Sequence, residues 1–380
     1  MHVFAGVLGL AIIAIILGDA FETIISPRRV TRKFRLTRLF YRYSWLLWRA
    51  LCRPIRTRKR REAYLSFFGP LSLLLLLVLW AVVMILGFAM LQWAFGSAIL
   101  NSEGQSAGFA VDLYTSGTTF FTLGLGDEHP ASSMARFLMV CEAGLGLGFL
   151  AIVIGYLPVV YQAFSRREAN ITLLDARAGS PPSAVEMLRR YAEAHALGEL
   201  PHLLQDWERW SAELLESHIS YPVLAMFRSQ HANESWVASL TVIMDVCSLL
   251  ILGIGGTPSR QAQLTFAMAR HAAVDLAQVM GTPPSAPLPD RLAHADFEHL
   301  RELLGRNGVQ FRHAAAGEAQ LQEIRSMYEP YVNALANYLL LDLPSWFVSE
   351  PRPDNWQTSA WERRARRIRL EQFESADDHL

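Results

Sequence analysis

The chain has 380 residues, 52% of them hydrophobic, and its 35 basic and 35 acidic side chains give a formal net charge of +0. This composition is too apolar for an ordinary soluble protein and too polar for a protein buried mostly in lipid, so a membrane part joined to a soluble part is expected. The three cysteines are scattered and form neither a disulfide pattern nor a metal-binding pattern, which fits a reducing compartment for the soluble part.

Three segments are apolar enough to be membrane helices. Residues 1–18 and 63–102 contain no Asp, Glu, Lys or Arg, and residues 134–164 contain only two charged side chains. A helix needs about 20 apolar residues to span the hydrocarbon core, so the second and third segments qualify. The first is either an uncleaved spanning helix or a signal peptide. The spanning helix is favoured because no small-residue cleavage site follows, and Asp19 and Glu22 lie where one is expected.

The basic residues predict the orientation of these segments. Residues 28–61 contain fourteen Lys and Arg side chains, whereas residues 97–133 contain none. Cytoplasmic loops carry an excess of Lys and Arg, so the first of these segments is expected in the cytoplasm and the second outside. Everything after Arg166 is then cytoplasmic.

A helix is expected over residues 36–56, with one face marked by a stripe of basic side chains. The stripe consists of Arg38, Arg42, Arg49, Arg53 and Arg56. This pattern is typical of a helix lying at the inner leaflet, where arginines meet anionic head groups. The alternative is a solvated basic helix docked on the soluble domain.

A short motif lies between the second and third apolar segments. It reads Thr122-Leu123-Gly124-Leu125-Gly126-Asp127. A Thr-x-Gly-x-Gly strand lets backbone carbonyls point inward and replace the water around a dehydrated cation. The two glycines are needed because a Cβ atom obstructs the required backbone angles.

At this motif the chain resembles the potassium-channel pore-loop family, over about residues 68–163. The usual family filter reads Thr-Val-Gly-Tyr-Gly-Asp, so Leu123 is a mild change and Leu125 in place of Tyr is a real departure that bears on selectivity. The resemblance implies an outer helix, a pore helix near residues 108–121, the filter and an inner helix. It also implies that K⁺ is held by the carbonyls of Thr122, Leu123, Gly124 and Leu125.

The resemblance extends into the inner helix, where Gly146 stands at the spacing of the family's hinge glycine. With Gly144 and Gly148 it gives three possible bending points, and close helix packing is the alternative explanation for these glycines. Further along, Pro158 removes a helical hydrogen bond. With Gly155 it predicts either a kink at the gate or the end of the helix near residue 161.

Two residues are expected to support the filter. Tyr114 matches a family position whose aromatic side chain bonds the filter aspartate, here Asp127; the alternative is simple packing at the membrane interface. Glu142 is the only acid inside the inner helix, and an intramembrane carboxylate is a functional candidate by default. It faces either the ion pathway or the back of the filter, where Thr118 or Thr119 offers a hydroxyl.

After residue 167 the composition becomes that of a soluble helical domain. Helices are expected at 184–197, 201–217, 235–254, 258–280, 290–305, 317–341 and 358–373, with a short strand at 170–174 and turns or linkers at 178–183 and 281–289. The apolar helix at 235–254 is assigned to the core of the domain rather than to the membrane, because Asp245 lies near its middle.

The soluble domain offers no convincing catalytic or cofactor-binding motif. The glycines at 253–256 follow a helical pattern rather than a strand, so nucleotide binding is not favoured. His294, Asp296 and His299 do not share one helix face, so a metal site is not favoured either.

The sequence therefore predicts an all-α fold in four parts. These are an N-terminal transmembrane helix at 1–26, a basic interfacial segment at 27–62, a pore module at 63–165 and a cytoplasmic helical domain at 166–380. The predicted function is passive K⁺ conduction by a homotetramer in the plasma (inner) membrane, because a single filter strand cannot enclose an ion. K⁺ is the permeant ion, anionic lipids are the expected partners, and neither enzymatic chemistry nor a cofactor is expected. The alternatives are a weakly selective monovalent cation channel and a non-conducting membrane-anchored sensor or scaffold.

Overall fold

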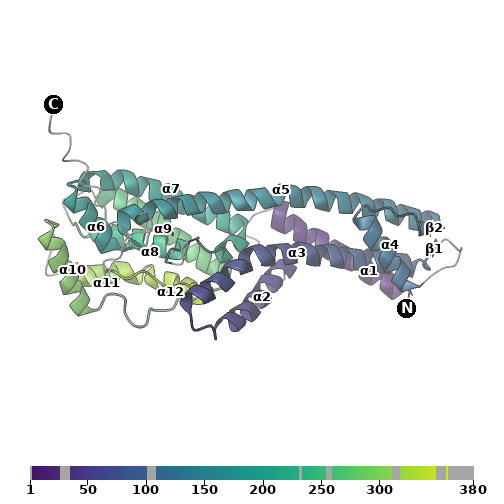
Figure 1. Cartoon of the computed structure of the whole chain (residues 1–380), viewed down its shortest axis with the longest axis horizontal. Coiled ribbons are helices and arrows are strands. Elements are labelled where there is room, and N and C mark those ends of the chain that lie inside the picture. The colour runs from purple at the N-terminus through teal and green to yellow at the C-terminus, as the bar shows by residue number, and fades with distance from the viewer. Residues whose placement is uncertain are drawn as a thin grey trace, which may run out of the picture. The chain divides into compact units, whose positions relative to one another are not determined.

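The structure, a computed structural model, describes residues 2–25, 35–100, 108–230, 233–253, 259–309, 317–347 and 357. The chain divides into two compact units, Met1–Gln162 and Ala163–Leu380. Helices make up nearly all of the regular structure in both, and the only strands among the described residues are two of two residues each. The predicted all-α fold is thus confirmed (Figure 1).

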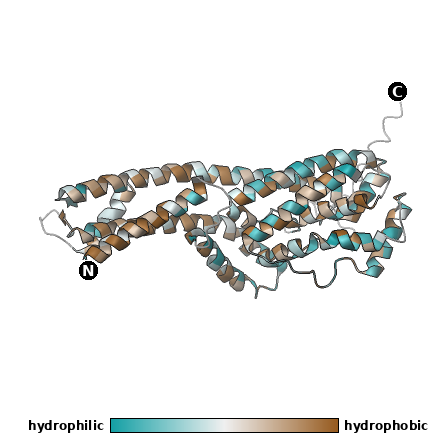
Figure 2. Ribbon diagram, turned by 180° about the vertical axis from the view of Figure 1, so that it is seen from behind, coloured by the Kyte–Doolittle hydropathy of each residue, from teal (hydrophilic) through white to brown (hydrophobic). Residues whose placement is uncertain are grey.

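The first unit contains the apolar helices. Its elements are α1 (His2–Ala20) with a π-helical turn at Phe21–Ile25, α2 (Leu36–Cys52), α3 (Arg58–Ala94), β1 (Ile99–Leu100), α4 (Phe109–Phe120), β2 (His129–Pro130) and the first part of α5 (Ser133–Ala178). Three helical segments are long and apolar enough to cross a membrane, namely His2–Ile24, Arg58–Ala94 and Ser133–Ala178. Their hydrophobic stretches are brown in Figure 2.

Glycines bring α1 and α3 into close contact. A Cβ atom added to Gly9 would lie 2.7 Å from the carbonyl oxygen of Gly87, and one added to Gly87 would lie 2.7 Å from Cγ1 of Ile13. Small residues permit this approach of two helix backbones in membranes. The first apolar segment is therefore an integral element of the unit, packed along α3.

The core of the first unit lies between α1, α3, α4 and α5. Buried side chains from all four helices form one cluster, which includes Ile13, Trp80, Phe120 and Leu138. At one end, β1 and β2 pair in antiparallel register, with Ile99 opposite Pro130. The two strands tie the segment after α3 to the segment before α5, and α4 with the 122–127 motif lies between these tied ends.

Helix α5 is longer than the sequence suggested. It runs without a break through Pro158 to Ala178, so of the two alternatives at Pro158 the helix end near Tyr161 is excluded, and the short strand expected at 170–174 is wrong. Proline removes one backbone donor, but the helix continues beyond it because its last turns gain a core. Ile171, Leu174 and Ala178 are buried.

The second unit is a helical domain built around α8 (Trp236–Ile251). The other helices are α6 (Ala184–Glu193), α7 (Leu200–Ser220), α9 (Ser259–Met280), α10 (His294–Arg306), α11 (Gly317–Ser326) and α12 (Glu329–Leu339), with 3-10 turns at Leu197–Glu199 and Pro222–Met226. Every side chain of α8 from Trp236 to Leu250 is buried. Five other helices (α6, α7, α9, α11 and α12) contact α8, which confirms the prediction of a core helix at this position.

Three other predictions for this unit have different outcomes. The expected helix at 317–341 is two helices, because Pro330 occupies the first turn of α12, where proline starts a helix rather than continues one. The stretch 281–289 is an irregular connection between α9 and α10, held by the bond from Ser285 N to Pro330 O at 3.0 Å. The expected helix at 358–373 lies outside the described residues.

Candidate functional site

The motif at 122–127 begins one residue after the end of α4 and has a distinctive backbone. Thr122, Gly124 and Gly126 have positive φ angles of 56°, 57° and 78°, whereas the intervening leucines do not. Alternation between right- and left-handed residues turns successive peptide groups in the same sense, so that their amides or their carbonyls converge on one side. An ordinary strand instead alternates its carbonyls. The alternating φ angles therefore distinguish this backbone from an ordinary strand and allow its peptide groups to converge on one side.

The side chains of the motif are exposed in the single chain. Leu123 is 61% exposed and Leu125 is 63% exposed, although both are large apolar residues. All of residues 122–127 are exposed in the same way. The single chain therefore leaves both leucines of the motif uncovered.

A hydrogen bond links the motif to the helix before it. The Tyr114 hydroxyl donates to Oδ2 of Asp127 at 2.7 Å. Tyr114 lies in α4, so this bond spans from the middle of the helix to the far end of the motif. The bond expected from the sequence is present, and it fixes the last residue of the motif relative to the helix.

Glu142 lies behind α4 rather than in an open channel. It is fully buried, and one carboxylate oxygen accepts a hydrogen bond from the hydroxyl of Ser116. The same hydroxyl lies 2.8 Å from the carbonyl oxygen of Ile85 in α3. Of the two placements considered, the one behind the motif is observed, but the partner is Ser116.

Helix geometry explains why Thr118 does not take this role. Each residue advances about 100° around a helix, so Thr118 faces about 200° away from Ser116. Its hydroxyl donates to the carbonyl of Thr115 within α4, at 3.0 Å. The backbone carbonyls of Thr118 and Thr119 instead accept from Leu123 N and Thr122 N, at 2.8 and 3.0 Å. Both threonines therefore hold the start of the motif through their backbone.

The glycines of α5 are not equivalent. A Cβ atom added to Gly146 would lie 1.9 Å from the carbonyl oxygen of Phe120, the last residue of α4. One added to Gly144, Gly148 or Gly155 would meet nothing within 4 Å of this chain. Close packing, one of the two interpretations of Gly146, therefore accounts for that glycine. Pro158 lies inside the helix, three residues beyond Gly155.

Sequence reasoning missed two further contacts around the motif. Ser97 donates to the buried carboxylate of Asp112 in α4 at 2.6 Å, and Gln92 of α3 donates to the carbonyl of Ala135 in α5 at 3.3 Å. Asp112 gave a usable signal, because it is the only acid in the pore-helix segment. These contacts hold the outer ends of α3, α4 and α5 together.

Comparison with known proteins agrees with this geometry. The model of a family described as "Ion channel" matches residues 72–163, which run from α3 to α5 and include the whole motif. Over this segment the chain is similar to an ion-channel family. The matched residues include most of α3, all of α4, the 122–127 motif and the first part of α5.

The chain is also similar to an uncharacterized membrane protein, YdjJ, of Bacillus subtilis (strain 168). The two are 24% identical over 214 residues, which are 56% of this chain and 60% of the relative. The match thus spans less than two thirds of the relative's length. No solved structure matches the chain.

The inner helix enters the core of the second unit through Arg167. Its side chain is buried and donates to the carbonyls of Leu224 at 2.8 Å and Phe227 at 2.9 Å. His218 Nε2 lies 3.2 Å from the same guanidinium, and its Nδ1 lies 2.8 Å from the carbonyl oxygen of Leu214. Because the guanidinium can only donate, the contacts require a neutral imidazole with its proton on Nδ1. Burial, and secondly the charge of Arg167, hold the pKa of His218 well below its usual value.

The charge in the middle of α8 is neutralised by a distant arginine. The two guanidinium nitrogens of Arg291 lie 2.6 and 3.3 Å from the carboxylate of Asp245, and Arg291 also pairs with Glu329 at 2.8 Å. The Tyr328 hydroxyl donates to Asp245 as well, and burial, followed by that carboxylate, raises the pKa of Tyr328 well above its usual value. Buried charges persist when they are paired and hydrogen-bonded in this way, so this cluster has a structural role.

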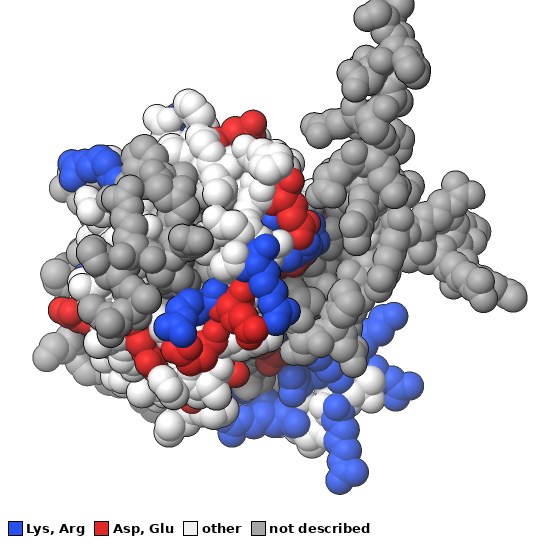
Figure 3. All heavy atoms as spheres, turned by 90° about the vertical axis from the view of Figure 1, so that its left-hand side faces the viewer, with Lys and Arg blue, Asp and Glu red and all other residues white. Residues whose placement is uncertain are grey.

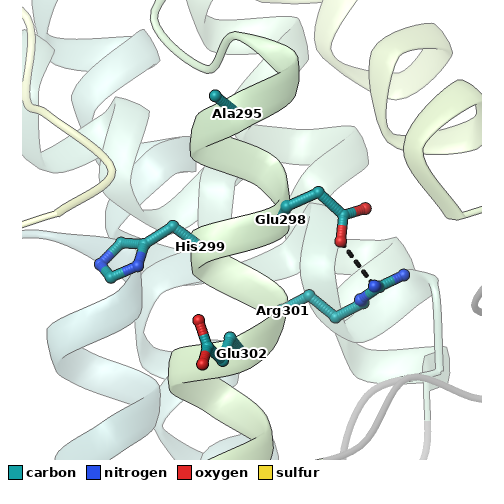
Figure 4. Close-up of a pocket in the computed structure, with 5 residues that line it drawn as sticks. All are labelled: Ala295, Glu298, His299, Arg301 and Glu302. Atoms are coloured by element: carbon teal, nitrogen blue, oxygen red, sulfur yellow. Dashed lines mark ion pairs between the residues drawn. The ribbon is translucent and has the colours of Figure 1, made fainter.

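The structure does not bring together the histidines that the sequence analysis considered as possible metal ligands. His294 pairs with Glu318 at 2.8 Å, whereas the ring of His299 lies 5.3 Å from that of Phe347. Figure 4 shows a shallow surface hollow on α10, in which Glu298 pairs with Arg301 on the same helix. The described residues contain no group of three His, Cys, Asp or Glu that could hold a metal ion. Of the glycines at 253–256, only Gly253 is described; it follows a helix, as expected.

Proposed function

We propose that the protein is a homotetrameric potassium channel in which four copies of residues 122–127 form a central filter. The observation that carries this proposal is the positive φ at every second residue of the motif. It favours one row of carbonyls per chain, and a dehydrated cation needs a closed ring of such rows. K⁺ would lie between the carbonyl planes of Thr122, Leu123, Gly124 and Leu125.

The dipole of helix α4 gives an electrostatic reason for the proposed filter to bind cations. Helix α4 ends at Phe120, directly before the filter, so the partial negative charge of its C-terminus lies beside the first carbonyls. Four such helices would lower the energy of a cation at the symmetry axis. Conduction would be passive, driven by the electrochemical gradient, with no covalent chemistry.

The orientation rests on the distribution of basic residues. The density of Lys and Arg at 28–61, against none at 97–133, supports an orientation with the filter outside and the second unit in the cytoplasm beneath a plasma membrane. The long uncharged stretches of α1 and α3 support this topology.

Gating would reach the pore through α5. This unbroken helix carries the Gly146 contact at its pore end and the buried Arg167 at its other end. Between them, Gly155 has open space around it and Pro158 lacks a backbone donor. We infer that bending takes place at 155–158 rather than at Gly146. The stimulus would act on the second unit or on lipid.

A flux assay on purified protein in liposomes tests the central proposal. We expect thallium or K⁺ flux that is blocked by Ba²⁺, and a mass in detergent that corresponds to four copies. A tetramer without flux under any condition would favour the non-conducting sensor or scaffold. Monomers and dimers alone, at every concentration, would contradict the filter assignment itself.

Leu125 supports a second candidate, a weakly selective monovalent cation channel. A tyrosine at this position would offer a hydroxyl to tether the filter, whereas leucine has no hydrogen-bonding atom. One neutral hydrogen bond is worth about 1 kcal/mol, and four-fold symmetry repeats the loss. A reversal potential that stays near the K⁺ value as external Na⁺ is varied would eliminate this candidate. Leu125→Tyr is expected to raise the K⁺/Na⁺ permeability ratio or to slow the loss of conduction in Na⁺; no change in either would show that the tether is irrelevant here.

A further inference from the structure

Helix α2 presents three distinct faces, of which one is fixed to α3. Trp45 on this face is 1% exposed, and its ring lies 4.9 Å from the ring of Phe68. One turn along, the indole of Trp48 donates to the carbonyl of Tyr64 at 3.2 Å. These contacts hold α2 against the start of α3 along much of its length.

A buried carboxylate holds the beginning of α2. Asp19, at the end of α1, accepts from the backbone N–H of Thr37 at 3.2 Å, from the Thr37 hydroxyl at 2.5 Å and from the Trp80 indole at 3.1 Å. A carboxylate is favourable at the N-terminus of a helix because of the helix dipole. The contact ties α2 to the end of one candidate membrane span and to the side of another. The beginning of α2 therefore lies at the end of α1 and beside the middle of α3, and the rest of α2 runs along the first half of α3.

The second face of α2 is apolar and exposed. It consists of Leu39, Tyr43, Leu46, Leu47 and Leu51, which are between 38% and 65% exposed. Their spacings of four, three, one and four residues place them on one side of a helix. No described part of the first unit covers this side, and exposed apolar faces of this kind usually mark an interaction surface.

The third face carries arginines and lies between the other two. Arg38, Arg42 and Arg53 are exposed on it, and α2 contains no acidic residue. Figure 3 shows exposed Lys and Arg side chains gathered toward the lower right of the view. Guanidinium groups bind phosphate in a bidentate manner, so this face complements a surface of phosphate head groups.

We propose that the free side of α2 is seated in a membrane leaflet rich in anionic lipid. The leucines would enter the acyl boundary and the arginines would bind lipid phosphates at the same depth. Two observations select lipid over other occupants: the continuity of α2 with the spans of α1 and α3, and an apolar face bordered by positive charge alone. The proposal rests on the membrane topology proposed above, but not on conduction.

Fluorescence quenching in vesicles tests this placement. An environment-sensitive fluorophore is attached at Leu47→Cys in the full-length protein, after the native cysteines have been replaced by alanine. The matched control is Leu288→Cys, because Leu288 is 93% exposed on the irregular connection of the second unit. Each protein is reconstituted in phosphatidylcholine with or without phosphatidylglycerol, and is exposed to spin-labelled lipid or to aqueous iodide.

The expected result is strong quenching at position 47 by spin-labelled lipid and weak quenching by iodide, with the opposite pattern at position 288. Omission of phosphatidylglycerol, or the double change Arg38→Gln and Arg42→Gln, should weaken the lipid quenching at 47. Each basic side chain near an anionic surface changes the equilibrium constant for binding to that surface about fivefold. The double change should therefore reduce the binding constant of α2 for the anionic leaflet about thirtyfold.

Three outcomes would overturn the proposal. Strong iodide quenching at 47 would show a solvated helix. Protection from both quenchers would show that another copy or the second unit covers the face. Lipid quenching at position 47 that stays the same without phosphatidylglycerol and in the arginine double variant would show that α2 does not require anionic lipid. Flux measured on the same vesicles is independent of all three, so a silent pore with intact lipid quenching would contradict only the proposed channel function.

Discussion

Replacing Gly146 by alanine is expected to push the inner helix away from the pore helix. The new Cβ atom would lie 1.9 Å from the carbonyl oxygen of Phe120 and 2.8 Å from its carbonyl carbon, whereas ordinary contacts begin at 3.4 Å. The obstructing atoms are backbone, so no side-chain rotation relieves the clash. The helices would have to separate by more than about 1 Å, directly behind the start of the filter.

The cost can be estimated from the behaviour of overpacked cores. Inserting one extra methyl group into a tightly packed site costs about 1–3 kcal/mol, and four subunits repeat it, for a total of about 4–12 kcal/mol in the assembly. We expect the variant to show a lower dissociation temperature of the tetramer in detergent and a loss of thallium flux in liposomes. Both measurements are made on the same preparation.

Gly144→Ala and Gly148→Ala provide matched controls on the same helix. Neither added Cβ atom meets another atom of the chain within 4 Å, and both changes raise helix propensity by the same amount as Gly146→Ala. The two controls are expected to retain the stability and flux of the unchanged protein. The packing argument fails if Gly146→Ala is as stable and conductive as they are. A variant of normal stability that only opens differently would restore the hinge interpretation.

Three further predictions concern the filter and the second unit. Tyr114→Phe removes the bond to Asp127, so flux should be lost faster during incubation without K⁺; an unchanged rate would show that the bond does not brace the filter. Gly124→Ala and Gly126→Ala place a Cβ at positive φ, at about 1–2 kcal/mol each, and should abolish selective flux while the tetramer persists. The pKa of His218 is depressed in the folded state, so its contribution to stability is complete above pH 6.5 and declines as the pH falls below that value, by at most about 1.4 kcal/mol per pH unit. Thermal unfolding of the intact protein by Trp fluorescence should show this acid dependence, and His218→Gln should lack it.

Much of the pore could be read from the sequence because its determinants are local. The motif at 122–127 is recognisable from residue types at short, fixed spacings, and the bond of Tyr114 to Asp127 was expected from the resemblance to the potassium-channel pore-loop family. The partner of Glu142 could not be read in the same way. Choosing between Ser116 and its neighbours requires the rotational phase of α4 relative to α5, and tertiary packing sets that phase. The role of Gly146 was open for the same reason, since a glycine in a helix permits both bending and close approach.

Longer-range features of the second unit were harder to predict. Asp245 correctly argued against a membrane position for its helix, but its partner Arg291 is 46 residues away and carries no sequence signal. The end of α5 was left open between two alternatives because Pro158 permits either a kink or a helix stop. Proline removes only its own donor, and burial of the turns beyond it favours continuation of the helix.

The continuity of α5 constrains how the second unit can act on the pore. At one end, Gly146 touches the backbone of the pore helix so closely that any bend there would disturb the filter. At the other end, Arg167 is buried and bonded to two backbone carbonyls, so this turn moves with the second unit. We therefore expect α5 to bend between Gly146 and Arg167, where Pro158 removes a backbone hydrogen bond and Gly155 has open space beside it. If the protein is the channel proposed above, a bend at this place would move the far end of α5 without disturbing the contact of Gly146 with the end of α4.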